Sequence, residues 1–214
     1  HPLRDFTFIT GLSSYTFALV VKADSPWKTV EDLFAAGKAN PEKHTYGTSG
    51  IGGSGHLMMI EIEQKVGSKF THIPYKGGAE WMQALLAGQV PVFMSDLPTV
   101  VPYARSGKVR VIAVTGDRRS QHLPDVPTFA EAGARGVEIA NQFSAFVAGG
   151  TPPAVVQQLN AVLHKALADP RLQKNFSEMA LEVSPSTPQE LRAMVRDDSE
   201  TYGAVIRRLN LSID

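Results

Sequence analysis

The chain of 214 residues is long enough for one large or two small domains, and its 43% hydrophobic and 20% charged residues exclude a chain that is disordered throughout. Lys and Arg together number 21, as do Asp and Glu, and this zero net charge argues against a dedicated nucleic-acid binder, which would carry a basic excess. The absence of cysteine excludes disulfides, thiol catalysis and zinc–thiolate sites, and the apolar run at residues 17–21 is far shorter than the ~20 residues of a membrane-spanning helix.

Short β-rich runs alternate with helical stretches over the first half of the chain. This pattern is typical of an α/β fold with a largely parallel sheet. Gly67 is placed to end the helix that begins at Ser54. The predicted strands are residues 6–10, 17–22, 45–47, 70–74, 90–94 and 109–115, and the predicted helices are residues 29–39, 54–66, 79–87 and 98–105.

The second half of the chain is mainly helical in pattern. Residues 118–127 are polar and proline-rich without periodicity, which indicates a loop, and Thr128 is placed to cap a short helix through Ala132. Thr187 and Glu190 have the spacing of a capping box at the start of the last helix. The other predicted elements are strands 143–148 and 181–183 and helices 153–167 and 171–179.

The alternation of strands and helices is unbroken from Val20 to Thr115, so we expect a lobe of its own here, the second lobe, with bounds at about residues 17–117. Residues 1–16 and 118–214 then form the remainder of a first lobe, which has few strands to share a sheet. We therefore expect the strand at 143–148 either to pair with a second copy of the chain, giving a homodimer through the incomplete first lobe, or to leave an exposed apolar edge.

The segment from Tyr46 to His56, YGTSGIGGSGH, joins a predicted strand to a predicted helix through small residues. Glycines allow positive φ angles and a close approach of a ligand to the backbone. The helix N-terminus that follows offers unpaired N–H groups and a partial positive charge, so the segment suits an anion such as a carboxylate or phosphate. Hydroxyls of Thr48, Ser49 and Ser54 add donors. The alternative is a tight connection in which Ser54 simply caps the helix.

Gly50, Gly52 and Gly55 also match the dinucleotide pattern G-x-G-x-x-G. The acidic residue expected about 20 positions later is missing, but Lys76 follows the next predicted strand and is placed to meet a 2′-phosphate. An NADP-linked oxidoreductase is therefore an alternative function. No Gly-Lys-Ser/Thr is present, so the Walker A motif is absent, and the nucleophile elbow G-x-S-x-G is incomplete.

Two further loops follow predicted strands and should lie at the same carboxyl edge of the sheet. The first contains Tyr75, Lys76 and Gly77, in which the lysine either attracts an anion or is a solvated surface residue. The second contains Ser95 and Asp96, in which the aspartate either accepts a hydrogen bond from a ligand or caps the helix expected from residue 98. Three loops at one edge predict the rim of a binding pocket.

The remaining candidates point to binding and away from catalysis. The six histidines, at positions 1, 44, 56, 72, 122 and 164, have no metal-ligand spacing, so no metal site is predicted. His56 lies in the first turn of a helix, where it would be a neutral donor or a packing residue. Phe143 lines a cleft or fills the core. No carboxylate pair or Ser/His/Asp arrangement is present in the pattern, so no catalytic residue is assigned.

These motifs together resemble the substrate-binding receptors of tripartite tricarboxylate transporters, the TctC-like or Bug family. The similarity runs over essentially the whole chain in the family's order. The matching stretches are PLRDFT at 2–7, VEDL at 30–33, YGTSG at 46–50, SGHL at 54–57, IPYKG at 73–77, LAGQV at 86–90, LPDVPT at 123–128 and AG at 132–133.

The resemblance implies a type II periplasmic-binding-protein fold of two lobes and a periplasmic location. It also implies a receptor that closes on a small carboxylated metabolite and delivers it to the membrane permease subunits of the transporter, with no cofactor, no catalysis and no nucleic acid. The site residues that it implies are Thr48, Ser49, Gly50, Gly52, Ser54 and His56 as the grip of the second lobe, Tyr75, Lys76 and Gly77 beside it, Ser95 and Asp96 in the third loop, and Phe143 in the wall of the first lobe.

The chain departs from the family pattern in three places. Ser95 and Asp96 stand where the family usually has Asp-Asn, and QFS at 142–144 stands where it often has Trp-Phe-Gly. The family also carries a segment before the equivalent of Pro2, with the opening βα units of the first lobe, so we expect that lobe to be truncated at its N-terminus. A sensor or interaction protein without a transport role is a further alternative, because a truncated cleft need not close.

Overall fold

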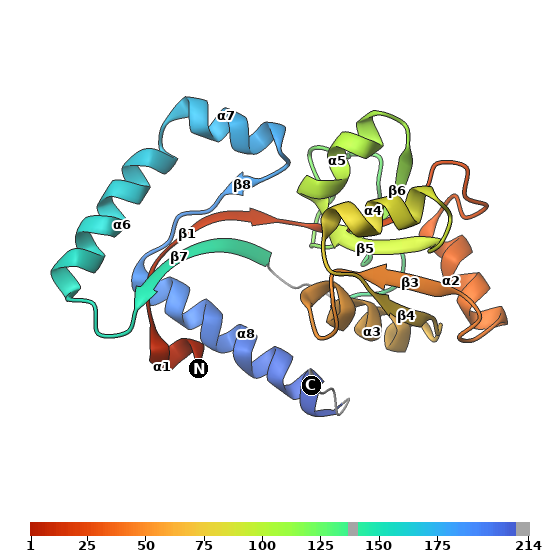
Figure 1. Cartoon of the computed structure of the whole chain (residues 1–214), viewed down its shortest axis with the longest axis horizontal. Coiled ribbons are helices and arrows are strands. Elements are labelled where there is room, and N and C mark those ends of the chain that lie inside the picture. The colour runs from red at the N-terminus through yellow and green to blue at the C-terminus, as the bar shows by residue number, and fades with distance from the viewer. Residues whose placement is uncertain (137–140, 209–214) are drawn as a thin grey trace. The chain divides into compact units, whose positions relative to one another are not determined.

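The computed structural model describes residues 1–136 and 141–208, and this part of the chain forms two compact units. The first unit joins residues 1–15 to residues 141–208, and the second contains residues 16–136. Figure 1 shows the elements of both units. On sequence alone, residues 118–136 are expected in the first lobe, but in the structure they belong to the second unit. Phe129 lies in the core of that unit, and Thr128 forms a short parallel bridge to Val114.

A five-stranded sheet forms the centre of the second unit, with the strand order β4-β3-β5-β2-β6. β3 pairs in parallel with both β4 and β5, whereas β2 runs antiparallel to its neighbours β5 and β6. The sheet is therefore largely parallel, as predicted, with β2 as the reversed strand. The strands are β2 (Phe17–Lys22), β3 (Thr45–Thr48), β4 (Thr71–Pro74), β5 (Val92–Asp96) and β6 (Val109–Val114).

Helices cover both faces of this sheet, as the alternation of side chains along β5 shows. Val92 and Met94 lie in one hydrophobic cluster together with the buried faces of α2 and α3. Phe93, between them, points to the opposite face, where its ring stacks on Trp81 of α4 at a centroid distance of 4.2 Å. The helices are α2 (Val30–Ala39), α3 (Ser54–Val66), α4 (Gly78–Leu86) and α5 (Leu97–Arg105).

The ends of α2 and α3 follow local sequence signals. At the start of α2, Thr29 and Asp32 form a capping box, in which the side chain of each accepts a hydrogen bond from the backbone N–H of the other. Gly67 ends α3 in the left-handed conformation, with a φ of 66°, as predicted. The predicted bounds of α3 are confirmed.

The short helix predicted from Thr128 is wrong. Thr128 and Glu131 do exchange the hydrogen bonds of a capping box, at 3.2 and 2.8 Å. No helix follows, and the segment is a series of turns. The backbone N–H of Phe129 donates to the carbonyl of Val114 on β6 at 3.0 Å, so pairing with the sheet edge holds the chain where a helix would begin.

The first unit is built on a three-stranded antiparallel sheet with the order β7-β1-β8. β7 pairs with β1 along its length, from Phe6 opposite Ala148 to Tyr15 opposite Asn141. β7 thus pairs with a strand of its own chain and is the outer strand in the strand order, and the homodimer expected through this strand is not supported. The strands are β1 (Phe6–Tyr15), β7 (Asn141–Ala148) and β8 (Glu182–Val183).

Four helices complete the first unit. Asn160 and His164 of α6 connect that helix by hydrogen bonds to the sheet and to the segment before α8. The amide of Asn160 donates to the carbonyls of Ile9 and Ser186, at 2.8 and 3.1 Å, and the His164 ring lies 3.1 Å from the Thr10 hydroxyl. The predicted bounds of α6 and the predicted capping box before α8 are confirmed. The helices are α1 (Pro2–Asp5), α6 (Pro153–Leu167), α7 (Pro170–Glu178) and α8 (Pro188–Arg208).

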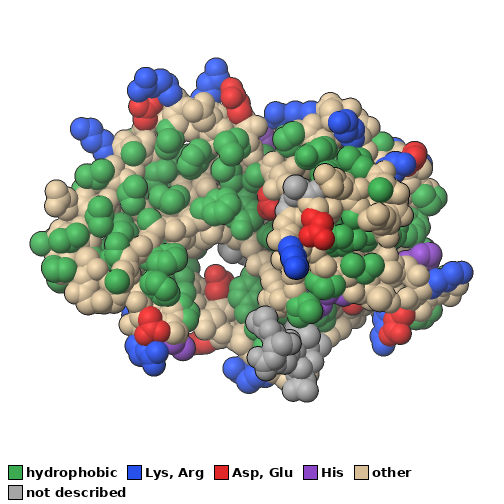
Figure 2. Space-filling view, viewed as in Figure 1, with side chains coloured by type: hydrophobic (Ala, Val, Ile, Leu, Met, Phe, Trp, Pro, Cys, Tyr) green, Lys and Arg blue, Asp and Glu red, His purple; other side chains and the backbone are tan. Residues whose placement is uncertain are grey.

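Large exposed apolar side chains concentrate in the first unit, on the left in Figure 2. Phe143 and Phe146 of β7 are 52% and 51% exposed, which agrees with the expected apolar edge. Val155 and Val162 add to them on α6. Within the described ranges, no helix combines the length and apolar character needed to cross a bilayer.

Candidate functional site

The glycine-rich segment leaves the end of β3 and turns into α3 as an open loop. Gly50 has a φ of 116° and Gly52 a φ of 73°, backbone conformations that L-residues rarely adopt. Ser49 and Gly53 are exposed, and Ser54 is half-buried. A Cβ added at Gly50 would meet no atom within 4 Å. The outer side of the loop is therefore not covered by the second unit.

The first turn of α3 presents backbone donors beside this loop. The first N–H to bond within the helix pattern is that of Leu57, which donates to the carbonyl of Gly53 at 3.0 Å. In residues 1–136 and 141–208, the N–H groups of Ser54, Gly55 and His56 find no hydrogen-bond acceptor. Three adjacent donors and the positive end of the helix dipole form the arrangement that binds carboxylate and phosphate oxygens.

The imidazole rings of His56 and His72 stack on one another and form hydrogen bonds with residues of the glycine loop. The rings of His56 and His72 lie 3.9 Å apart at an angle of 13°. Nδ1 of His56 accepts a hydrogen bond from the Gly52 N–H at 3.0 Å, and Nε2 of His72 lies 2.7 Å from the hydroxyl of Thr48. That hydroxyl in turn donates to the carbonyl of Gly50 at 3.0 Å. His56 is thus bonded directly to the loop at Gly52, and His72 is bonded to Thr48, which in turn bonds to Gly50.

Burial determines the charge state of the two rings. His56 is only 6% exposed, and burial lowers its pKa. Burial and the neighbouring His56 together lower the pKa of His72 to about 4. Both imidazoles are therefore neutral at neutral pH. This agrees with the expectation of a neutral His56, whose side chain contacts the loop and whose backbone N–H has no acceptor among the described residues.

The loop after β4 lies against the glycine loop. The N–H of Tyr75 donates to the carbonyl of Thr48 at 2.9 Å. Lys76 is exposed, and its N–H donates to the carboxylate of Glu80 at 3.0 Å. Gly77 is the N-cap of α4. The structure thus brings this loop and the glycine loop together at the carboxyl edge of the sheet.

The third loop uses its polar side chains internally. Ser95 is 1% exposed, and its hydroxyl donates to Oδ1 of Asp96 at 3.2 Å. Oδ2 of Asp96 accepts hydrogen bonds from the N–H and hydroxyl of Thr99, at 3.0 and 2.5 Å. Asp96 is the N-cap of α5, which begins at Leu97. Of the two roles that the sequence leaves open for Asp96, the structure shows the cap.

Not all predicted site residues present a side chain to this edge. The hydroxyl of Thr48 is buried and the N–H of Gly52 is bonded to His56, so both shape the loop from within. Phe143 belongs to the first unit, where its ring lies 4.9 Å from that of Tyr15. His72 was noted in the sequence only for lacking metal-ligand spacing. His72 lies opposite Tyr46 of β3 in the strand register, and this pairing brings it next to the glycine loop.

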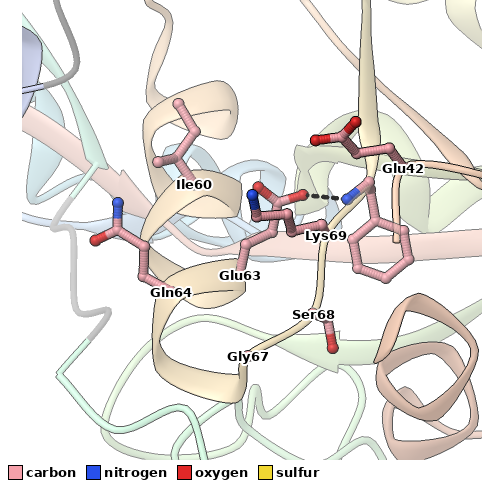
Figure 3. A pocket seen from close by; sticks show the side chains of 8 residues that line it. Glu42, Ile60, Glu63, Gln64, Gly67, Ser68 and Lys69 are labelled. Carbon is pink, nitrogen blue, oxygen red and sulfur yellow. Dashed lines mark hydrogen bonds between the residues drawn. The ribbon is translucent and has the colours of Figure 1, made fainter. Parts of the chain in front are cut away.

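A cavity of about 460 Å³ opens at the other end of α3, around its C-terminal Gly67 (Figure 3). Two carboxylates, those of Glu42 and Glu63, lie on its wall. Oε1 of Glu63 accepts a hydrogen bond from the N–H of Phe70 at 2.8 Å, and burial raises the pKa of Glu63 to about 7. The lining combines two carboxyl groups with a single lysine, so it offers no concentration of positive charge for the predicted carboxylate. The other lining residues are Ile60, Gln64, Ser68 and Lys69.

The arrangement at the glycine loop can hold an anion. Its hydroxyl–imidazole contact, between Thr48 and His72, is buried, and the Thr48 hydroxyl donates its hydrogen to the Gly50 carbonyl. No group of three or more His, Asp or Glu side chains suited to a metal ion occurs among the residues that the structure describes. The hydrogen-bond donors at the loop are its backbone amides and the hydroxyls of Ser49 and Ser54.

Comparison with known proteins agrees with a binding role. The family described as "Tripartite tricarboxylate transporter family receptor" matches residues 1–211. A Cupriavidus necator protein, the UPF0065 protein in gbd 5'region, is 37% identical over 99% of this chain and 64% of its own length. The chain spans 62–64% of the length of this relative and of two others, from a Pseudomonas strain and from Bordetella pertussis.

Solved structures share the fold. An R. palustris protein solved with adipate is 29% identical, with a TM-score of 0.90 over 97% of this chain and 69% of that protein. The periplasmic binding protein BugD is also 29% identical, with a TM-score of 0.86 over 97% of this chain and 70% of that protein. The α/β periplasmic-binding-protein fold expected from the sequence is confirmed.

Proposed function

Because the chain belongs to the tripartite tricarboxylate transporter receptor family, we propose that it is an extracytoplasmic receptor for a small carboxylated metabolite. In this proposal, a ligand carboxylate sits on the glycine loop and the first turn of α3. The receptor works in the periplasm and delivers its ligand to the membrane permease subunits of the transporter. It binds without making or breaking a covalent bond.

The observation that carries the proposal is the set of three free N–H groups, from Ser54, Gly55 and His56, beside an exposed loop. A carboxylate has two oxygens and about four acceptor positions, so one group can take bonds from two or three of these donors. The hydroxyls of Ser49 and Ser54 supply further donors at the rim. The adipate of the R. palustris relative supports a dicarboxylate as the class to test first.

Hydrogen bonds to the glycine loop alone do not trap the ligand, because trapping also requires the receptor to close. A receptor that closes around its ligand does so only if the ligand binds the closed state more tightly than the open one. We place the carboxylate on the second unit and assign the choice among metabolites to the surface that closes over it. Lys76 is exposed and contributes to attracting the anion before it binds.

The test is a thermal-shift screen of mono-, di- and tricarboxylates, followed by calorimetry with adipate and the uncharged diamide of adipate. A ligand at 100 times its Kd stabilises the folded protein by about 2.7 kcal/mol, which is readily measured. We expect at least one carboxylate to bind and the diamide to have no effect. A response to NADPH with none to any carboxylate would contradict the proposal and favour the oxidoreductase alternative.

A further inference from the structure

We propose that His56 and His72 are paired positioning residues that hold the glycine loop in its ligand-binding shape only while both imidazoles are neutral, so that acidification releases the ligand. The part that concerns the ligand rests on the proposed function. The part that concerns the loop rests on the geometry of the second unit alone.

The hydrogen bond from Gly52 fixes the state of His56. Nδ1 accepts the Gly52 N–H at 3.0 Å, which requires a lone pair on that nitrogen. The proton of the neutral ring is therefore on Nε2. Protonation would place an N–H on Nδ1, facing the N–H of Gly52, and two donors cannot bond to one another. The loop would have to turn Gly52 away.

His72 acts on the same loop through Thr48. The single hydroxyl hydrogen of Thr48 is donated to the Gly50 carbonyl, so its oxygen accepts a hydrogen from Nε2 of His72 at 2.7 Å. Protonation at Nδ1 would leave this bond in place. It would, however, put a positive charge on a ring stacked 3.9 Å from His56. The two rings therefore cannot both carry a charge without separating, and separation moves both bonded ends of the loop.

Among the described residues, the groups around the two rings provide no counter-charge for an imidazolium. On β3, the side chains beside the rings are uncharged: Tyr46, with centroid distances of 6.5 Å to His56 and 5.0 Å to His72, and Thr48, whose hydroxyl is bonded to His72. On the loop after β4 and the helix that follows, the charged residues Lys76 and Glu80 are exposed and influence the pKa of neither ring. The first turn of α3 adds partial positive charge. Each element around the pair thus favours the neutral rings.

The direction of the pH effect separates this role from a direct contact. If the imidazoles bound the ligand as cations, affinity would rise on acidification. If they only filled space, affinity would follow the protonation of the ligand and nothing else. A pair that must be neutral predicts a loss of affinity as the pH falls below the ordinary imidazole range, toward pH 4.

The test combines a titration of the wild-type protein with a double variant, His56→Asn with His72→Gln, whose two side chains do not become protonated in this pH range. In His56→Asn, the side-chain oxygen can accept the Gly52 N–H, and in His72→Gln, the amide can donate to Thr48. The amide NMR signal of Gly52 and the imidazole signals are followed from pH 7.5 to pH 4 without ligand. Adipate affinity is measured over the same range by calorimetry, each protein being normalised to its own value at pH 7.5, and His122→Asn serves as the control.

We expect the Gly52 amide signal to move with the midpoint of the His56 ring, and wild-type affinity at pH 4 to fall at least threefold further than that of the double variant. Protonation of adipate itself affects all proteins alike, so it cancels in the ratio of the wild-type loss of affinity to the loss of the double variant. A Gly52 signal that is unchanged while the rings titrate would overturn the proposal, as would a ratio that stays constant or an affinity that rises. If adipate binds to none of the proteins, the proposed function fails, whereas the Gly52 titration still decides the role of the pair.

Discussion

The carbonyl of Thr48, the last residue of β3, accepts at 2.9 Å the N–H of Tyr75, the first residue after the parallel strand β4. This bond extends the ladder between the two strands into their loops. It keeps the chain after β4 beside the glycine loop, at the edge where α3 begins. A ligand on the first turn of α3 is thus bordered by two loops of the same unit.

Replacement of Ser54 by proline should weaken carboxylate binding more than replacement by alanine. Proline removes the N–H as well as the hydroxyl, whereas alanine removes only the hydroxyl. Proline suits the first residue of a helix, and Gly53, with φ −71° and ψ 164°, has the extended backbone required before it. A hydrogen bond to a charged group contributes about 1.5–3 kcal/mol, so the proline variant should lose roughly 10- to 100-fold more affinity than the alanine variant.

Calorimetry with the carboxylate found in the screen measures this difference, and circular dichroism checks that both variants fold. Equal affinities for Ser54→Pro and Ser54→Ala would mean that the N–H of Ser54 does not touch the ligand. The donors that bind the carboxylate would then have to lie in another part of the loop.

Gly50 and Gly53 offer a matched pair for testing the loop conformation. Gly50→Ala introduces a side chain at a φ of 116° and should destabilise the second unit by about 1–3 kcal/mol, with a matching loss of ligand affinity. Gly53→Ser places a preferred N-cap residue at an ordinary extended backbone and should leave the melting temperature unchanged or raise it. Thermal unfolding of both variants measures these changes in stability. A Gly50→Ala protein as stable as the wild type would show that the loop can adopt another conformation at no cost.

Asp96 should contribute to stability through its cap. Asp96→Ala removes the acceptor for the N–H and hydroxyl of Thr99 and should cost about 1 kcal/mol, whereas Asp96→Asn keeps a side-chain oxygen and should cost only a few tenths. Urea unfolding of the two variants measures the difference. Equal losses for alanine and asparagine would show that the negative charge, not the cap, is what stabilises this position.

Local signals in the sequence predicted the helices well, because a helix end depends on residues three or four positions away. The bounds of α3 and α6, the capping box at Thr187 and the left-handed Gly67 all follow from such signals. The reversal of β2 could not be predicted, since an apolar run such as residues 17–22 has no direction in its pattern. Its direction is set by pairing with β5 and β6, more than 70 residues away in the chain.

The candidate site likewise has a part that depends on neighbouring residues and could be predicted, and a part that depends on distant residues and could not. The open glycine loop and the helix start were evident from residues 46–56, which are contiguous. The role of His72 depends on a register between two strands 26 residues apart, in which Tyr46 lies opposite His72. The second unit also retains residues 118–136 because Phe129 reaches its core, and the polar, proline-rich sequence before it gave no sign of that contact.

The cavity at the far end of α3 gives a pH-dependent prediction that is independent of ligand binding. Burial raises the pKa of Glu63 to about 7, from the 4.5 of an exposed glutamate, so the folded protein holds its proton more tightly than the unfolded chain does. The stability that this proton provides is complete below pH 4.5 and is lost as the pH rises toward 7. Glu63→Gln, which keeps an acceptor for the Phe70 N–H, should therefore match the wild type at pH 4.5 and exceed it at pH 8, by about 1–2 kcal/mol after allowance for partial exposure.

The melting temperatures of wild type, Glu63→Gln and Glu61→Gln at pH 4.5 and pH 8 test this prediction. A gain of 1–2 kcal/mol corresponds to roughly 2–8 °C for a protein of this size. Glu61 lies on the same helix but does not line the cavity, so its variant should shift equally at both pH values. If Glu63→Gln gives no gain at pH 8, the carboxylate of Glu63 is better solvated, or better paired with Lys69, than its place in the cavity wall indicates, because only a poorly solvated and unpaired carboxylate destabilises the fold when it ionises.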